Sequence, residues 1–129
     1  MKIYLLFSHT LTDEQKSELE KMGVSDIIPI PEDLQFIWSN MPPAGELNIT
    51  VLNEIIDWLS GSASEGDYIL IQGDFGATYY MVNWAFKSGL IPIYATTERV
   101  VLEENKEGDR IVKKNIFRHV NFRRYVAFE

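Results

Sequence analysis

The sequence predicts a single α/β domain, in which a parallel sheet carries helices on both faces and an antiparallel β-hairpin follows. Short apolar runs typical of buried strands alternate with helical segments, a pattern characteristic of Rossmann-like folds. The 129 residues suit one compact domain. From about residue 98 onwards, the alternation of strands and helices gives way to two extended runs. We therefore expect one domain over residues 1–129, with a parallel-sheet core at 1–97 and a hairpin with a basic tail at 98–129.

The beginning of the chain predicts two strands around one helix. Residues 2–7 form a nearly continuous apolar run, as expected of a strand buried on both faces. Thr12 followed by Gln15 has the spacing of a capping box and predicts a helix that ends at Gly23. A second, shorter strand is expected over residues 26–30.

Two helices are expected next. Pro31 suits the first turn of a short helix that reaches Trp38, and the Pro/Gly-rich segment 41–45 interrupts the chain. Apolar residues recur at helical spacing over residues 46–59, and a polar loop follows at 60–66.

The second half returns to the alternation of strand and helix. Residues 68–71 are a buried strand, which leads into a glycine-containing turn at 72–78 and a helix ending near Gly89. A fourth strand is expected over residues 91–95. Two extended runs, 99–103 and 110–117, flank a loop at 105–109 and predict the hairpin.

Composition excludes several classes of protein. The absence of cysteine excludes disulfides, Cys-rich zinc sites and thiol catalysis. No apolar run approaches the roughly 20 residues that span a bilayer, and no signal peptide is evident, so we expect a cytoplasmic protein without a membrane partner. The formal charge of −7 argues against duplex DNA as a partner. Residues 110–129 nevertheless hold six Lys/Arg and one acidic residue, which suits an anionic ligand or salt bridges to the acidic body.

The predicted site lies at the carboxyl ends of the strands. Open parallel sheets bind ligands there, where the strand order reverses, and we expect the first and third strands to be adjacent at that point. Ser8, His9 and Thr10 would then face residues 72–78 across one crevice, with Thr96 and Thr97 on its flank. This inference depends on the strand order.

The segment 72–78 is the strongest local signal for a ligand. Gly73 and Gly76 permit close backbone approach, the following helix offers free N–H groups, and Thr78 offers a hydroxyl to a phosphate. Asp74 is expected to cap the helix or bind a ribose hydroxyl. The alternative is a plain strand–turn–helix connection. The ligand-binding residues predicted here are Gln72, Gly73, Asp74, Phe75, Gly76, Ala77 and Thr78. Neither dinucleotide nor ATP-binding glycine motifs are present.

Individual side chains add candidates with their alternatives. His9 suits a general base, a hydrogen-bond donor to a phosphate, or a nucleophile that becomes phosphorylated. Alternatively, it is a hydrogen-bonded loop residue. Arg99 suits a phosphate contact, or is an exposed residue that starts the hairpin. His119 is a candidate anion contact. Trp38 suits a core or interface anchor, or, together with Phe36, a group that stacks on a base. We predict His9, Thr10 and Arg99 as catalytic residues, and no metal site and no cofactor.

The sequence resembles a known family along nearly its whole length. The segments that carry the resemblance are Lys2-Ile-Tyr-Leu-Leu-Phe-Ser-His-Thr-Leu-Thr12, Trp38-Ser-Asn-Met-Pro-Pro43, Ile71-Gln-Gly-Asp-Phe-Gly-Ala-Thr78, Gly89-Leu-Ile-Pro-Ile-Tyr-Ala-Thr-Thr97 and Arg118-His119. They are similar to the small stand-alone CRISPR-associated proteins of the Csx series, group twenty.

This resemblance implies a CARF-like (CRISPR-associated Rossmann fold) homodimer of type III CRISPR defence that binds cyclic oligoadenylate, cyclic tetra-adenylate above all. It also implies a ring nuclease that opens the ring without metal, leaves a 2′,3′-cyclic phosphate and thereby switches off the antiviral signal. The resemblance assigns no catalytic residues.

Two alternatives remain open at this stage. One is a protein of the same fold that sequesters the ring without cutting it. The other is a phosphocarrier in which His9 accepts a phosphoryl group, although the usual glycine-rich partner loop is replaced by Asp74-Phe-Gly-Ala-Thr78.

Overall fold

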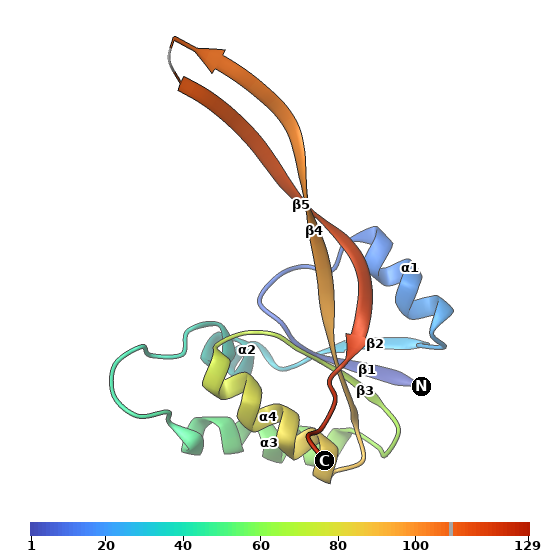
Figure 1. The fold of residues 1–129 in the computed structure, drawn as a ribbon. Coiled ribbons are helices and arrows are strands. Elements are labelled where there is room, and N and C mark those ends of the chain that lie inside the picture. Colours follow the sequence, from blue (N-terminus) through green and yellow to red (C-terminus); the bar gives the residue numbers. More distant parts are fainter. Residues whose placement is uncertain (109) are drawn as a thin grey trace.

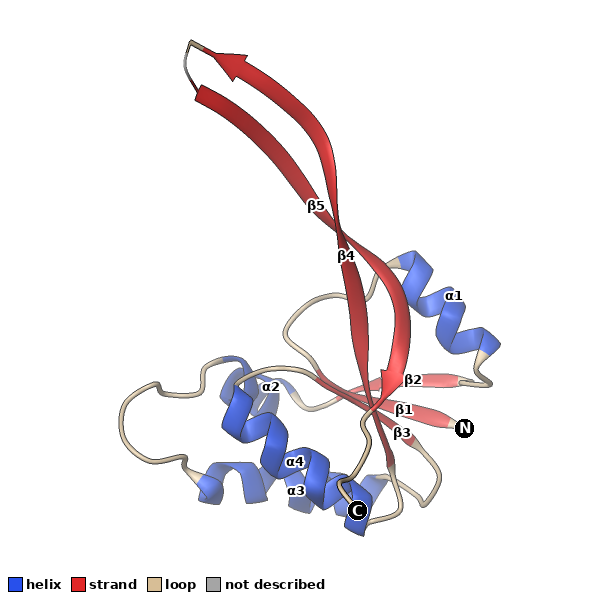
Figure 2. Ribbon diagram, in the orientation of Figure 1, coloured by secondary structure: helices blue, strands red, loops and turns tan. Residues whose placement is uncertain are grey.

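The structure is a computed structural model that describes residues 1–108 and 110–129, with the side chains of 102–107 and 112–114 outside the description. Figures 1 and 2 show nine elements in this described part of the chain. They are β1 (Lys2–Leu6), α1 (Asp13–Lys21), β2 (Asp26–Pro29), α2 (Glu32–Ser39), α3 (Ile49–Ser62), β3 (Tyr68–Ile71), α4 (Phe75–Lys87), β4 (Ile91–Glu107) and β5 (Arg110–Arg124).

All five strands join one sheet in the order β2-β1-β3-β4-β5. The first four strands run parallel, and β5 pairs antiparallel with β4, so the sheet is mixed and the hairpin is part of it. The expected adjacency of the first and third strands is confirmed, since Leu6 of β1 lies opposite Ile71 of β3. The strand order therefore reverses between β1 and β3.

Helices cover both faces of the sheet, because alternate strand residues point to opposite sides. Tyr4 and Ile69 belong to the core cluster that includes α2, α3 and α4. Ile3 and Leu70, one residue away in each strand, pack with Leu19 of α1 on the other side. The central strands are thus buried on both faces, which explains their continuous apolar runs.

The predicted helix caps are present. The Thr12 hydroxyl accepts a hydrogen bond from the N–H of Gln15, whose side-chain oxygen accepts one from the N–H of Thr12. Asp74 caps α4 by accepting from the N–H of Ala77 at 3.0 Å. Gly23, which follows α1, adopts a φ of 94° that other residues rarely tolerate. Helix α3 runs to Ser62, so the polar loop is shorter than predicted.

The hairpin differs from the prediction. The sequence predicts a strand that ends at residue 95 and a separate hairpin from 99, but β4 is one strand of 17 residues that crosses this boundary without a break. Thr96 explains the continuity, since its hydroxyl donates to Asn121 of β5 and holds the two strands together. Residues 105–107 of the expected loop belong to β4, and Asp109 lies outside the described residues.

Beyond the sheet, β4 and β5 continue as a two-stranded arm, defined here as residues 98–107 and 110–118 (Figure 1). The ribbon twists and carries register shifts between Thr96 and Thr97 and between Val101 and Glu103. In the described part of the chain, no helix is both long and apolar enough to cross a membrane.

Candidate functional site

The carboxyl ends of β1 and β3 lie side by side. The N–H of Gln72 donates to the carbonyl oxygen of Leu6 at 3.0 Å, which continues the parallel pairing one residue beyond the end of β3. The two following loops, residues 8–10 and 72–74, therefore leave the sheet from neighbouring positions. We call these six residues the switch-point edge. The strands that lead into the two predicted segments are therefore neighbours, while the crevice expected between the segments stays a prediction.

Beneath this edge lies Trp38. Its Nε1 donates to the carbonyl oxygen of Gln72 at 3.0 Å. A Cβ added at Gly73 would stand 2.9 Å from the indole ring, closer than real Cβ contacts. Trp38 is only 2% exposed, so its interpretation as a core anchor is confirmed and its interpretation as a base-stacking group is wrong, whereas Phe36 is exposed. The indole alone accounts for the glycine at position 73.

Ser39 joins the switch-point edge from α2. Its hydroxyl donates to the hydroxyl of Ser8 at 3.0 Å, and it accepts from the side-chain amide of Gln35 at 2.9 Å. Both serines are exposed, so their hydroxyls are open to a ligand. Sequence reasoning missed Ser39, because no local pattern links it to a residue 31 positions earlier.

His9 and Thr10 are exposed on the loop after β1. The His9 ring stands edge-on to Phe7, with ring centroids 5.4 Å apart and planes at 70°. Among the residues that the structure describes, His9 has no hydrogen-bonding or ionic partner. An accessible imidazole can form hydrogen bonds to a ligand.

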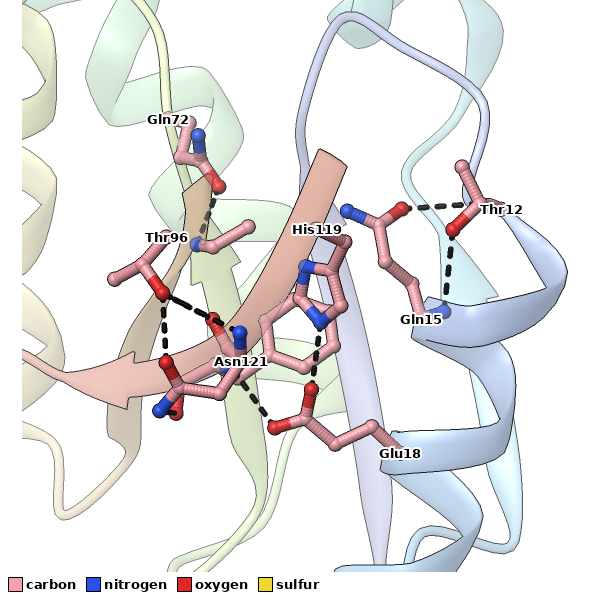
Figure 3. Close-up of polar contacts among 9 residues, drawn as sticks. Thr12, Gln15, Glu18, Gln72, Thr96, His119 and Asn121 are labelled. Carbon is pink, nitrogen blue, oxygen red and sulfur yellow. Dashed lines mark hydrogen bonds and ion pairs between the residues drawn. The ribbon is translucent and has the colours of Figure 1, made fainter. Parts of the chain in front are cut away.

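Gln72 and Thr96 use their side chains to hold strands together. The side-chain oxygen of Gln72 accepts from the N–H of Ala95 at 2.7 Å, which ties the end of β3 to β4 (Figure 3). The Thr96 hydroxyl bonds Asn121 at 2.6 Å. Thr97 is exposed, and its expected place on the flank of the edge stays a prediction.

Arg99 lies on the arm and stacks on Phe117, with its Cζ 5.8 Å from the ring centroid. The ring is exposed and lines a groove of about 340 Å³ together with Thr12 and Asp13 at the start of α1. The loop that carries His9 and Thr10 leads directly into that helix start. Arg99 is thus stacked on a ring that lies beside the start of α1.

His119 does not lie at the switch-point edge. Its side chain is only 6% exposed, and its Nε2 lies 2.6 Å from a carboxylate oxygen of Glu18 on α1 (Figure 3). The other oxygen of Glu18 accepts from the N–H of Phe122 at 2.7 Å. The pair latches β5 to α1, so in this arrangement His119 is shielded from the anionic ligand that the sequence suggests for it.

The start of α4 presents a second exposed surface. Phe75 is 94% exposed, whereas Ala77 is fully buried and offers no side chain to a ligand. The Thr78 hydroxyl is buried without a hydrogen-bond partner among the described residues. Phe75 and Thr78 line a groove of about 520 Å³ between α4 and the C-terminal residues 125–128, which we call the α4 groove.

Tyr125 connects the α4 groove to the sheet. Its hydroxyl donates to the carbonyl oxygen of Ile71 at 2.6 Å, directly before the switch-point edge. Burial, and secondly the neighbouring Tyr94, raise the pKa of Tyr125 above its ordinary value of 10.0. Sequence reasoning missed Tyr125, although an aromatic residue beside a basic run could have drawn attention to it. In the described part of the chain, no cluster of three or more His, Asp or Glu side chains could hold a metal ion.

Comparison with known proteins decides the family. The family model described as "Uncharacterized protein MJ1673 family" matches residues 1–123. The chain belongs to this family. A protein of Methanocaldococcus jannaschii, "Uncharacterized protein MJ1673", is 46% identical over 125 residues, which cover 96% of each chain. No solved structure matches. The family match spans the switch-point edge and the arm, and it ends two residues before Tyr125.

Proposed function

We propose that this protein is a CARF-like, Rossmann-like ring nuclease that binds a cyclic oligoadenylate, in particular cyclic tetra-adenylate, at the switch-point edge and linearises it. Cleavage would switch off type III CRISPR signalling in the cytoplasm. The observation that carries the proposal is the adjacency of β1 and β3, which aligns residues 8–10 with residues 72–74 at the point where the strand order reverses. The resemblance to the Csx series suggests the ligand.

The switch-point edge has the chemistry that a phosphodiester ring requires. Ser8, His9 and Thr10 expose hydrogen-bond donors on one side of the edge. On the other side, the N–H groups of Phe75 and Gly76 have no acceptor within α4, because they belong to its first turn. The positive end of the helix dipole favours an anion there. Backbone and hydroxyl donors of this kind bind phosphate regardless of the negative total charge of the protein.

The proposed reaction needs no external nucleophile. A ribose 2′-oxygen of the ring attacks its own phosphorus, so an O2′–P bond forms and the P–O5′ bond breaks. The 2′-hydroxyl loses a proton, the 5′-oxygen gains one, and the product is linear with a 2′,3′-cyclic phosphate. His9 would transfer the proton, while Thr10 and Arg99 would stabilise the charge on the phosphate. Neither a metal nor a cofactor takes part.

A homodimer follows from the symmetry of the ligand. A ring of four identical nucleotides can lie across a twofold axis, so that two copies each present one switch-point edge to it. One ring would then bind per two chains. Arg99, which pairs with Phe117 in the arm, would contact the ring from the arm.

The experiment is incubation of the protein with labelled cyclic tri-, tetra- and hexa-adenylate in EDTA, with bound and linear species followed over time. The proposal predicts a linear product with a 2′,3′-cyclic phosphate from the tetra-adenylate ring. Tight binding without product would favour the alternative, a protein of the same fold that sequesters the ring. Neither binding nor cleavage of any ring would reject both.

A further inference from the structure

The α4 groove has the composition of a site for a flat aromatic ligand. Its walls include Phe75, Tyr79 and Phe128, whose side chains are 94%, 74% and fully exposed. Its volume of about 520 Å³ lies within the range of small-molecule sites, and such sites combine aromatic walls with few polar groups. Exposed aromatic rings at a concave surface are the usual platform for stacking nucleobases.

Thr78 argues for a ligand that forms hydrogen bonds. This residue lines the α4 groove, and its hydroxyl is buried without a partner among the described residues. An unpaired buried hydroxyl destabilises a protein, so a partner is expected in some state. The oxygen itself is covered in this structure, so the side chain has to rotate about its Cα–Cβ bond to present the hydroxyl to the groove, and threonine adopts two such rotamers in helices. An apolar side chain from another protein would leave the hydroxyl unpaired, whereas the nitrogen edge of a purine would pair with it. Asn83 adds an exposed amide to the same wall.

The α4 groove adjoins the switch-point edge. Phe75 follows Asp74 directly, and Tyr125 reaches from the groove to the carbonyl oxygen of Ile71. A cation lies behind Tyr125. The rings of Tyr125 and Tyr94 have centroids 4.7 Å apart, and the Arg123 guanidinium lies 5.9 Å from the centroid of the Tyr94 ring. A nucleotide with its base in the groove could therefore place its phosphate towards the switch-point edge.

We propose that the α4 groove binds an adenine base of the cyclic oligoadenylate, stacked on Phe75 and Tyr79 and hydrogen-bonded to the Thr78 hydroxyl. The identity of the base rests on the proposed function. The groove would therefore select the base, while the switch-point edge holds the phosphate on which the reaction takes place.

The test compares binding of cyclic tetra-adenylate and of adenosine monophosphate by wild type and by the variants Phe75→Ala, Tyr79→Ala and Thr78→Val. Ile27→Ala is the matched control, because this exposed apolar residue lies on β2 at the opposite edge of the sheet. Loss of one stacking ring should weaken binding of the tetra-adenylate by about 10-fold or more. Thr78→Val should weaken it by about 2- to 10-fold.

Thermal melting of the free proteins shows whether the variants fold. Thr78→Val should melt no lower than wild type, because it removes an unpaired hydroxyl and keeps the shape of the side chain. A valine variant that is stable yet binds adenine weakly would separate a binding role from a structural one. A valine variant that melts well below wild type would show that the hydroxyl has a partner within the protein, which would overturn its assignment to the ligand.

The remaining outcomes distinguish the two proposals. Ring binding that is equal in wild type and all groove variants would overturn the adenine site and leave the proposed function standing. If adenosine monophosphate binds and the variants lose it, while no ring binds, the proposed function fails and the adenine site stands. If neither ligand binds, and Phe75→Ala converts a dimer to a monomer, the α4 groove is an interface between copies and the inference is overturned.

Discussion

The indole ring of Trp38 lies directly against the backbone of Gly73, so closely that a Cβ at position 73 would approach the ring to 2.9 Å. The same indole donates a hydrogen bond to the carbonyl oxygen of Gln72. One buried side chain of α2 therefore fixes the position of the backbone at residues 72 and 73, which belong to the switch-point edge. The geometry of the proposed site depends on this contact.

Replacement of Gly73 by alanine tests that dependence. Since Trp38 is buried and cannot move freely, Gly73→Ala should lower the free energy of unfolding by about 1–3 kcal/mol. Gly76→Ala is the matched control in the same segment, because its Cβ would meet its nearest neighbour at an ordinary 3.6 Å and alanine favours helices. Urea denaturation measures both. Equal stability of the two variants would show that the indole does not constrain the loop.

Glu18 is expected to hold the base of the arm to the body. Its carboxylate accepts from the N–H of Phe122 and pairs with His119, and both groups would lose their partner in Glu18→Ala. The expected loss of unfolding free energy is about 1–3 kcal/mol. Glu20→Ala, an exposed position on the same helix, should change stability by less than about 0.5 kcal/mol. If chemical denaturation gave the same small change in unfolding free energy for Glu18→Ala and Glu20→Ala, this role of Glu18 would be refuted.

The raised pKa of Tyr125 predicts that the folded protein loses stability at alkaline pH. Its pKa is raised in the folded protein, so the folded state holds the phenolic proton more tightly than the unfolded state. The stabilisation is complete below the ordinary value of 10.0 and is lost as the pH rises through the higher folded pKa. Tyr4, whose pKa is raised by burial and then by Asp67, acts in the same direction.

The measurement is the free energy of unfolding across the alkaline range for wild type and Tyr125→Phe. The variant should lose about 0.5–1.5 kcal/mol at neutral pH, because the hydrogen bond to Ile71 is gone. It should also decline less steeply above pH 10 than wild type. Tyr79→Phe, with an exposed side chain, is the control. A Tyr125→Phe profile parallel to that of wild type would contradict the pKa shift.

Local sequence patterns predicted the parts of the fold that depend on neighbouring residues. The capping box of Thr12 with Gln15 and the cap by Asp74 join groups three residues apart, so their spacing is visible in the sequence. The buried strands were recognisable because they are apolar on both faces. The adjacency of β1 and β3 followed from a general rule for open sheets and placed the switch-point edge correctly.

Contacts between distant residues were beyond such patterns. The partner of Trp38 lies 34 residues away, that of Tyr125 lies 54 away, and that of His119 lies 101 away. Each of these side chains has a role set by the residue that folding brings beside it. The sequence therefore left Trp38 open between a core anchor and a stacking group and suggested an anion contact for His119, whereas the structure buries both side chains.

The most direct test of the proposed function is a single-turnover measurement with excess protein, labelled cyclic tetra-adenylate and EDTA, for wild type and His9→Ala. We predict that wild type forms a linear product with a 2′,3′-cyclic phosphate. His9→Ala should cut the rate constant by about 100-fold or more, since general acid–base groups contribute that much, while the ring still binds. A wild-type protein that leaves the ring intact would contradict the assignment as a ring nuclease.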